Sequence, residues 1–308
     1  MAILVDLSQV VLGSCYAFKD QLTTESTATN KQQAVDLIRH VILSQLKAYN
    51  VKYRSQYGKM IISCDGKNYW RKKLYPHYKA NRKKVRHESN LDWPLIFDTI
   101  NMIISDLRNN FMFPVVQVDG AESDDVIATL TKYFQTNEVQ HSDWLIPQTQ
   151  PILIISSDKD FVQLQKYDNV KQLSPRTKMA VTDPDPVKYL QIKCLSGDKG
   201  DNIPSVVNPI DAFNDESIKK CAPLTKKKIE SLLNEGYDNC SDPVIKNRWL
   251  QNSQLIDFEY IPKKISEAII ETYNRPIVGN QSKIFNYLIH NNCNLLLNDI
   301  NAFSVVTL

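Results

Sequence analysis

Acidic residues that follow short apolar runs are the side chains of this sequence best suited to chemistry. The runs AILV, IISC, VVQV and ILIISS each lead into acids, and the candidate site residues among these are Asp6, Asp65, Glu122, Asp124, Asp125, Asp158 and Asp160. Apolar runs rich in Ile and Val are typical of strands buried on both faces of a parallel sheet. Such a sheet binds ligands outside the carboxyl ends of its strands. We therefore expect four successive strands to bring these acids to one edge.

This concentration of carboxylates predicts a metal site. Two carboxylates 4 Å apart repel by about 4 kcal/mol at an effective dielectric constant near 20, and Lys159 is the one basic residue interleaved among these acids. Oxygen ligands without His or Cys favour Mg²⁺ or Mn²⁺. So many acids suggest two ions about 3.5–4 Å apart, the arrangement used to cleave phosphodiesters. Any single Asp after a strand is as easily a helix N-cap, so the prediction rests on the coincidence across four strands.

A strongly basic stretch lies between Asp65 and Glu88. It contains nine Lys and Arg residues and no acid, and removing these nine charges from the net charge of +3 leaves −6 for the rest of the chain. Basic residues interleaved with aromatic ones suit a nucleic acid, although a solvated helix face is the simpler alternative. The candidate nucleic-acid contacts are Trp70, Tyr78, Arg82, Lys83, Lys84 and Arg86.

The pattern of elements predicts an α/β domain followed by an all-α domain. Buried strands are expected at residues 2–7, 60–64, 113–118 and 152–156, with short additions at 170–173 and 179–181, and amphipathic helices at 31–49, 93–107 and 122–134. This alternation indicates a doubly wound parallel sheet. After the breaker at 183–186 only helical patterns follow, at 187–195, 226–234, 245–255 and 283–290. We place the domains at 1–182 and 183–308.

Composition excludes several classes of protein. The 308 residues are 43% hydrophobic and 23% charged, which rules out a wholly disordered chain. No apolar run reaches the roughly 18–20 residues of a membrane helix. The six Cys are scattered without a CxxC motif, so we expect neither a zinc site nor a disulfide framework, and a reducing compartment.

Four motifs, in order, resemble those of the structure-specific 5′-nuclease, or flap endonuclease, family. They are YKANR at 78–82, ESDD at 122–125, SDKD at 157–160 and GDKGDNIPS at 197–205, and they follow an N-terminal strand that ends in Asp6. The resemblance covers nearly the whole chain. It implies a PIN-like nuclease domain and a helical domain that grips duplex DNA with a helix–turn–helix variant.

The resemblance also implies roles for individual residues. Asp198 and Asp201 match a pair that the helix–turn–helix loop contributes to the second metal site, and Asp125 matches a neighbouring acid. Arg71 and Lys79 match basic residues that clamp the scissile phosphate, and Tyr78 matches an aromatic that stacks on the terminal nucleotide. Residues 67–90, the arch segment, match an arch over the active site. The metal-binding acids of the family match Asp6, Asp65, Glu122, Asp124, Asp158 and Asp160.

The activity implied is a metal-dependent 5′→3′ exonuclease or flap endonuclease. It would act on 5′ ends of RNA–DNA hybrids and of nicked or flapped duplex DNA, removing RNA primers during phage-type DNA replication in the host cytoplasm. The expected cofactors are two Mg²⁺ ions, with Mn²⁺ able to substitute, and a monovalent cation at the 197–205 loop; the expected state is a monomer. The chain departs from the family where Ser205 replaces a Gly and residues 206–222 interrupt the usual hairpin.

Three alternatives come from other classes. The first is a branched-DNA-binding protein of the same fold that has lost catalysis, which the retained acids disfavour. The second is another metal-dependent α/β enzyme, a phosphatase or a PIN-type ribonuclease, which accounts neither for the arch segment nor for GDKGDNIP. The third is an adaptor whose apolar tail at 300–308 docks on a sliding clamp or a single-strand-binding protein; packing of that tail on its own domain is the simpler interpretation.

Overall fold

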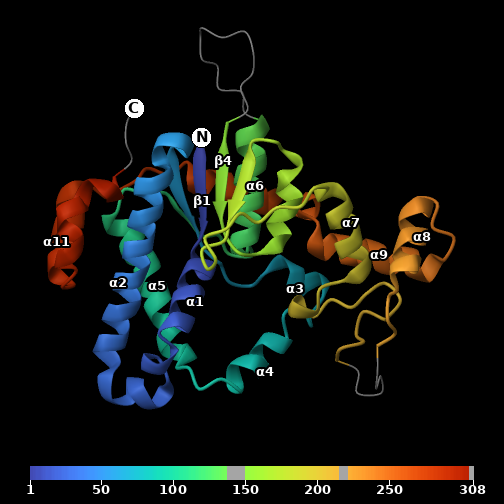
Figure 1. Cartoon of the computed structure of the whole chain (residues 1–308), viewed down its shortest axis with the longest axis horizontal. Helices are drawn as coiled ribbons and strands as arrows, with labels where there is room; N and C mark the ends of the chain where they lie inside the picture. The colour runs from blue at the N-terminus through green and yellow to red at the C-terminus, as the bar shows by residue number, and fades with distance from the viewer. Residues whose placement is uncertain (137–149, 215–220, 305–308) are drawn as a thin grey trace, which may run out of the picture.

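The centre of the molecule is a parallel sheet of five strands, in the order β3-β2-β1-β4-β5. The computed structural model describes residues 1–136, 150–214 and 221–304. The strands are β1 (Ala2–Asp6), β2 (Lys59–Ser63), β3 (Val115–Val116), β4 (Ile152–Ile155) and β5 (Val170–Leu173). Every residue of β1 and β4 is buried, as the continuous apolar runs predicted. The predicted α/β fold class is therefore confirmed (Figure 1).

Long helices cover one face of this sheet. They are α1 (Leu7–Ala17), α2 (Thr24–Tyr57) and α5 (Trp93–Asn110), joined from the C-terminal part of the chain by α11 (Gln281–His290) and the 3₁₀ segment η5 (Asn294–Phe303). Leu43, Leu46, Phe111 and Phe303 are fully buried in the core that they share. The predicted helix at 31–49 is the middle of the much longer α2.

The opposite face is covered by α6 (Ser123–Thr136), the 3₁₀ segment η2 (Lys159–Lys166) and α10 (Lys263–Tyr273). Ile127, Leu130, Phe161 and Ile269 are fully buried there. We did not predict α10. Its presence shows that the C-terminal part of the chain returns to the sheet on both faces, while the division at residue 182 stays a prediction.

A third core joins α7 (Pro186–Ser196), α8 (Lys226–Glu235) and α9 (Pro243–Ile256). Tyr75 and Tyr78 of the arch segment are buried in this core, so the arch segment is packed against the helical part of the chain. Beyond β5, the described part of the chain has no further strand: residues 179–181 supply a single bridge, between Leu173 and Ala180.

The apolar tail is partly accounted for by packing. Phe303 is 0% exposed and lies against Phe111 and Phe113, whereas residues 305–308 lie outside the described residues. None of the helices in the described ranges combines the length and hydropathy needed to cross a bilayer.

Candidate active site

Four acids lie at the carboxyl edge of the sheet. Asp6 ends β1, Asp65 follows β2, Asp124 is in the first turn of α6, and Asp158 follows β4 as the N-cap of η2. Because β1 pairs with both β2 and β4 in parallel, these strands end at the same edge. Across the described ranges no Lys or Arg forms an ion pair with any of the four, and we call them the open acids.

Neutral groups hold two of the open acids in place. The hydroxyls of Ser123 and Ser156 donate to Asp6, at 3.2 and 2.9 Å. The backbone N–H of Ser123 and the hydroxyl of Ser8 donate to Asp65, at 2.9 and 2.6 Å. These donors orient the carboxylates without neutralising them.

The electrostatics of the open acids favour an added cation. Burial, reinforced by the neighbouring Asp65 and Asp158, raises the pKa of Asp6 to about 7. Burial and nearby carboxylates also raise the pKa of Asp124 well above its usual range, and burial raises the pKa of Asp158. A divalent ion would relieve this repulsion.

The donor set, carboxylates alone, fits a hard divalent ion such as Mg²⁺ or Mn²⁺. Among the described residues, no group of three or more His, Cys, Asp or Glu side chains is arranged to hold a metal ion by itself. Mg²⁺ does not need one, since it keeps several waters and is usually held by one or two carboxylates together with phosphate oxygens. An all-carboxylate edge whose acids form no ion pair with a Lys or Arg of the described residues therefore suits a hard divalent ion.

The remaining candidate acids are neutralised by the protein itself. Lys193 of α7 forms ion pairs with Asp160 and Asp198, and its Nζ lies 3.0 Å from Asp198 Oδ2. Arg82 Nη2 lies 2.7 Å from Asp201 Oδ1. The cations that pair with Asp160 and Asp201 come from segments distant in sequence, so the near absence of Lys and Arg between the strand-end acids did not indicate them; Lys193 lies five positions before Asp198. We call Glu122, Asp125, Asp160, Asp198 and Asp201 the paired acids.

Arg71 is buried beneath the start of α6. Its Nη1 lies 3.0 Å from Glu122 Oε2 and 2.8 Å from Asp125 Oδ1, and its Nε donates to the carbonyl of Leu255 at 2.8 Å. Trp70 donates its indole N–H to Asp125 Oδ2 at 3.1 Å. Arg71 is 2% exposed, so these contacts position α6 against α9. Its role as a phosphate clamp stays a prediction.

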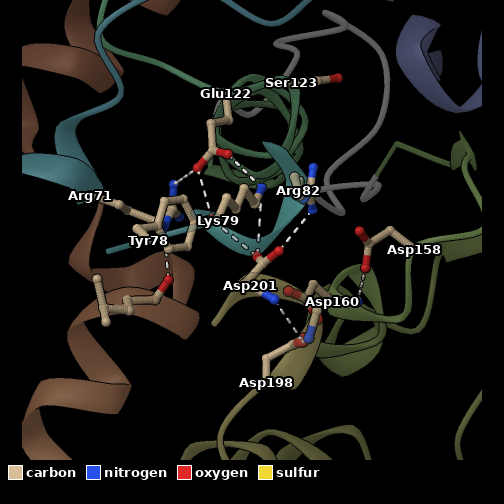
Figure 2. A network of polar contacts seen from close by, with 12 residues as sticks. Arg71, Tyr78, Lys79, Arg82, Glu122, Ser123, Asp158, Asp160, Asp198 and Asp201 are labelled. Atoms are coloured by element: carbon tan, nitrogen blue, oxygen red, sulfur yellow. Dashed lines mark hydrogen bonds and ion pairs between the residues drawn. The ribbon is translucent and has the colours of Figure 1, made fainter. Parts of the chain in front are cut away.

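Lys79 and Tyr78 lie between Glu122 and Asp201 (Figure 2). Lys79 Nζ is 2.6 Å from Glu122 Oε1 and 3.5 Å from Asp201 Oδ2. The Tyr78 hydroxyl is 3.0 Å from Glu122 Oε2 and 3.1 Å from Asp201 Oδ2. Burial alone would raise the pKa of Asp201, but Lys79 and Arg82 outweigh it and lower that pKa. Tyr78 is 3% exposed, and its predicted stacking on a nucleotide stays a prediction.

The backbone of the arch segment is fixed at the same place. Lys79 has a left-handed backbone (φ +58°), which is uncommon for a residue with a side chain, and its N–H donates to the carbonyl of Asp201 at 3.0 Å. Asn81 donates its side-chain amide to the carbonyl of Lys199 at 2.9 Å. Residues 69–82, which we call the inner half of the arch segment, are thus docked on the 197–205 loop.

The outer half, residues 83–88, makes few such contacts. The helix α4 (Asn81–His87) begins after Pro76 has separated it from α3 (Trp70–Leu74). Lys83 and Lys84 are exposed. The guanidinium of Arg86 lies 4.7 Å from the ring centroid of Phe97. The inner half contains five Lys and Arg residues, and the outer half contains three together with Glu88.

Comparison with known proteins defines the class to which this fold and site belong. Residues 1–190 match the family model described as 5′-3′ exonuclease, N-terminal resolvase-like domain. Residues 187–303 match the model described as T4 RNase H, C terminal. The chain therefore belongs to the 5′-3′ exonuclease family and is a 5′-nuclease, a phosphodiester hydrolase, which confirms the resemblance seen in the sequence motifs and disfavours a non-catalytic protein.

Individual relatives support the same family assignment. The chain is 32% identical to the ribonuclease H of Enterobacteria phage T4, over 97% of this chain and 95% of that protein. It is 27% identical to a 5′-3′ exonuclease of Aquifex aeolicus over 68% of this chain and 67% of that one. It is 26% identical to DNA polymerase I of Streptococcus pneumoniae over 66% of this chain, but it spans only 22% of that much longer relative.

Solved structures share the fold. The flap endonuclease of bacteriophage T5, in a pseudo-enzyme-product complex with DNA and metal ions, superposes with a TM-score of 0.53 at 17% identity, over 89% of this chain and 99% of that one. The T5 5′-exonuclease with bound zinc ions gives a TM-score of 0.52 at 19% identity, with the same coverage.

Proposed function

We propose that this 5′-nuclease is a Mg²⁺-dependent enzyme that removes RNA from the 5′ ends of RNA–DNA hybrids and trims nicked or flapped duplex DNA during phage-type replication. The observation that carries the proposal is the edge of four open acids beside the basic arch segment. The T4 relative is named ribonuclease H and the T5 neighbour a flap endonuclease, and these names support the substrate class.

The open acids Asp6, Asp65, Asp124 and Asp158 would hold a first Mg²⁺ ion, and the paired acids Asp160, Asp198 and Asp201 a second. When bound, the ions would lower the pKa of an attacking water and stabilise the departing 3′ oxygen. The serines that orient Asp6 and Asp65 keep these carboxylates directed along the sheet edge.

The cations of the chain act on the phosphate itself. Lys79 Nζ is within ion-pair distance of both Glu122 and Asp201, so a small rotation would present its charge to a phosphate entering beside these acids. A fixed cation at that place offsets charge that develops on the phosphoryl oxygens. The exposed Lys83 and Lys84 of the outer half would attract the nucleic-acid backbone before it reaches the site.

The tail at 300–308 remains our candidate contact for a sliding clamp or a single-strand-binding protein. Phe303 already fills the core, so such a contact would have to use residues after it.

Cleavage of a labelled substrate tests the proposal. A flap duplex with an RNA-tipped, 5′-labelled strand is incubated with and without Mg²⁺, with the wild type, Asp124→Asn and Asp119→Asn. Asp119 is the matched control, because it is an exposed acid that accepts from Asn68 near the same sheet edge. We expect Mg²⁺-dependent release of short 5′ fragments, lost in Asp124→Asn and retained in Asp119→Asn. Tight binding without cleavage under any divalent ion would instead favour the branched-DNA-binding alternative.

A further inference from the structure

Lys193 occupies the place between two acids that a second ion would use. It lies in the last turn of α7, and its side chain is 14% exposed. Its ammonium pairs with Asp160, which follows β4, and with Asp198, which begins the 197–205 loop. One lysine therefore joins acids from two separate elements, as a bridging metal ion would.

Asp198 is held in one orientation as the N-cap of the short 3₁₀ segment Lys199–Asp201. Its Oδ1 accepts the backbone N–H groups of Gly200 and Asp201, at 2.7 and 3.2 Å. Its Oδ2 is left facing Lys193, 3.0 Å away. The loop thus aims one carboxylate oxygen at the lysine, while the open acids nearby have no such cation within the described residues.

Lys193 also lines a groove. This groove of about 780 Å³ runs beside α7, and Asp158 and Asp198 line it as well. Lys159, Lys188 and Lys199 line it too, and all three are exposed. Asp183 and Asp185 also line the groove, so its lysines and aspartates are equal in number. A phosphate bound beside the exposed lysines would give the ammonium of Lys193, once displaced from the acids, a new partner.

We propose that Lys193 is a built-in cation that fills the second metal position until substrate arrives. In this account the first divalent ion binds the open acids without competition. The second must displace Lys193 from Asp160 and Asp198, and phosphates in the groove make that displacement easier. The second ion and the nucleic acid therefore bind cooperatively. This inference rests on the proposed function, because it assumes that Asp160 and Asp198 hold an ion.

Manganese binding in the absence of nucleic acid tests the proposal directly. Free Mn²⁺ is measured by electron paramagnetic resonance during titration of the wild type, Lys193→Met, Lys193→Arg and Lys188→Met. We expect one tight and one weak class of ion in the wild type. Removal of the competing charge in Lys193→Met should tighten the weak class by at least about tenfold, which corresponds to 1.4 kcal/mol.

The other variants separate charge from packing. Lys193→Arg keeps the cation, so its weak class should stay weak. Lys188→Met removes an exposed lysine from the same helix and groove and should leave the isotherm unchanged. An unchanged or weakened second class in Lys193→Met would overturn the proposal, since Lys193 would then merely support the acids. Circular dichroism and thermal melting establish that each variant is folded.

A second titration adds the product, a 5′-phosphorylated nicked duplex. Cooperativity is reciprocal between two ligands, so product should tighten the second Mn²⁺ class in the wild type and do so much less in Lys193→Met. Equal tightening in both proteins would overturn the proposal. The cleavage assay above is a separate readout. If the wild type cleaves the flap duplex but Lys193→Met binds both classes of Mn²⁺ with the affinities of the wild type, only this inference is refuted and the proposed function stands.

Discussion

Both halves of the arch segment are basic, but those of its cations that pair with acids belong to the inner half, which also has exposed lysines at 72 and 73. In the inner half, Arg71 is buried against Glu122 and Asp125, and Lys79 reaches Glu122 and Asp201. In the outer half, Lys83 and Lys84 face solvent. A dense run of basic residues thus contains two kinds of cation, one that pairs with the acids and one that is exposed and that we propose meets nucleic acid. Substitutions along the segment should separate the two.

The largest expected effect is on the stability of the fold. Arg71→Met would leave Asp125, which is 0% exposed, buried without its cation. Breaking a buried ion pair in this way costs about 3–5 kcal/mol, and urea denaturation measures the loss. Lys73→Met is the matched control, because Lys73 is an exposed residue of the same short helix. A similar small loss in both variants would show that the inner half does not support the fold.

The second largest expected effect is on the rate of cleavage. Lys79→Met should slow cleavage at saturating substrate by roughly 10²–10³-fold, the usual cost of removing one group that stabilises developing charge. Its effect on binding should be smaller, since the other cations of the arch segment still attract the phosphates. Single-turnover kinetics and a binding titration distinguish the two quantities, with Lys83→Met of the outer half as the control. Equal slowing in both variants would remove the distinction between the halves.

The open acids could be located from the sequence, whereas the ion-pair partners of the paired acids could not. The apolar runs located four strands and placed the open acids at one edge, because strand burial and strand ends are local properties of the chain. The partners of the paired acids are not local. Arg71 meets Glu122 across 51 positions, and Lys79 meets the same acid across 43. Only the tertiary fold brings them together, so the sequence pattern did not show that these acids have counter-charges from the protein itself.

The contacts of Lys193 were not predictable from the sequence either, although one of its partners is close to it in the chain. It lies five positions before Asp198, in the last turn of a helix that the sequence did predict. Nothing in the pattern indicated that the helix ends with this lysine turned toward Asp160. A basic residue in the last turn favours the helix dipole, so its presence had an ordinary explanation.

Arg82 lies at the boundary of the halves and should show an intermediate effect. Its side chain is 46% exposed and pairs with Asp201. The lowered pKa of Asp201 means that its ionised form stabilises the fold above the unfolded pKa, and that this stability is lost as the pH falls through the folded pKa. Arg82→Met should reduce the part of the free energy of unfolding that depends on the ionisation of Asp201. The reduction should be less than about 1 kcal/mol, since solvent screens an exposed ion pair. Urea denaturation from pH 6 down to pH 2 measures the change, because the lowered pKa of Asp201 lies below its usual value, and a steeper dependence in the variant would contradict it.

Substitutions in the outer half are expected to have the smallest effect, and the quantity they change is the affinity for nucleic acid. Lys83→Met combined with Lys84→Met should leave stability and the maximal rate unchanged, because neither side chain forms an ion pair within the described residues. It should instead weaken binding to all sequences alike. Removal of one lysine that touches a phosphate lowers the slope of log affinity against log salt by about 1, so the double variant should reduce that slope by about 2. Affinity for the flap duplex, measured over a series of salt concentrations with the Asp124→Asn background to prevent cleavage, gives the slope. An unchanged slope would mean that the nucleic acid does not pass the outer half, and the inner half alone would then define its path.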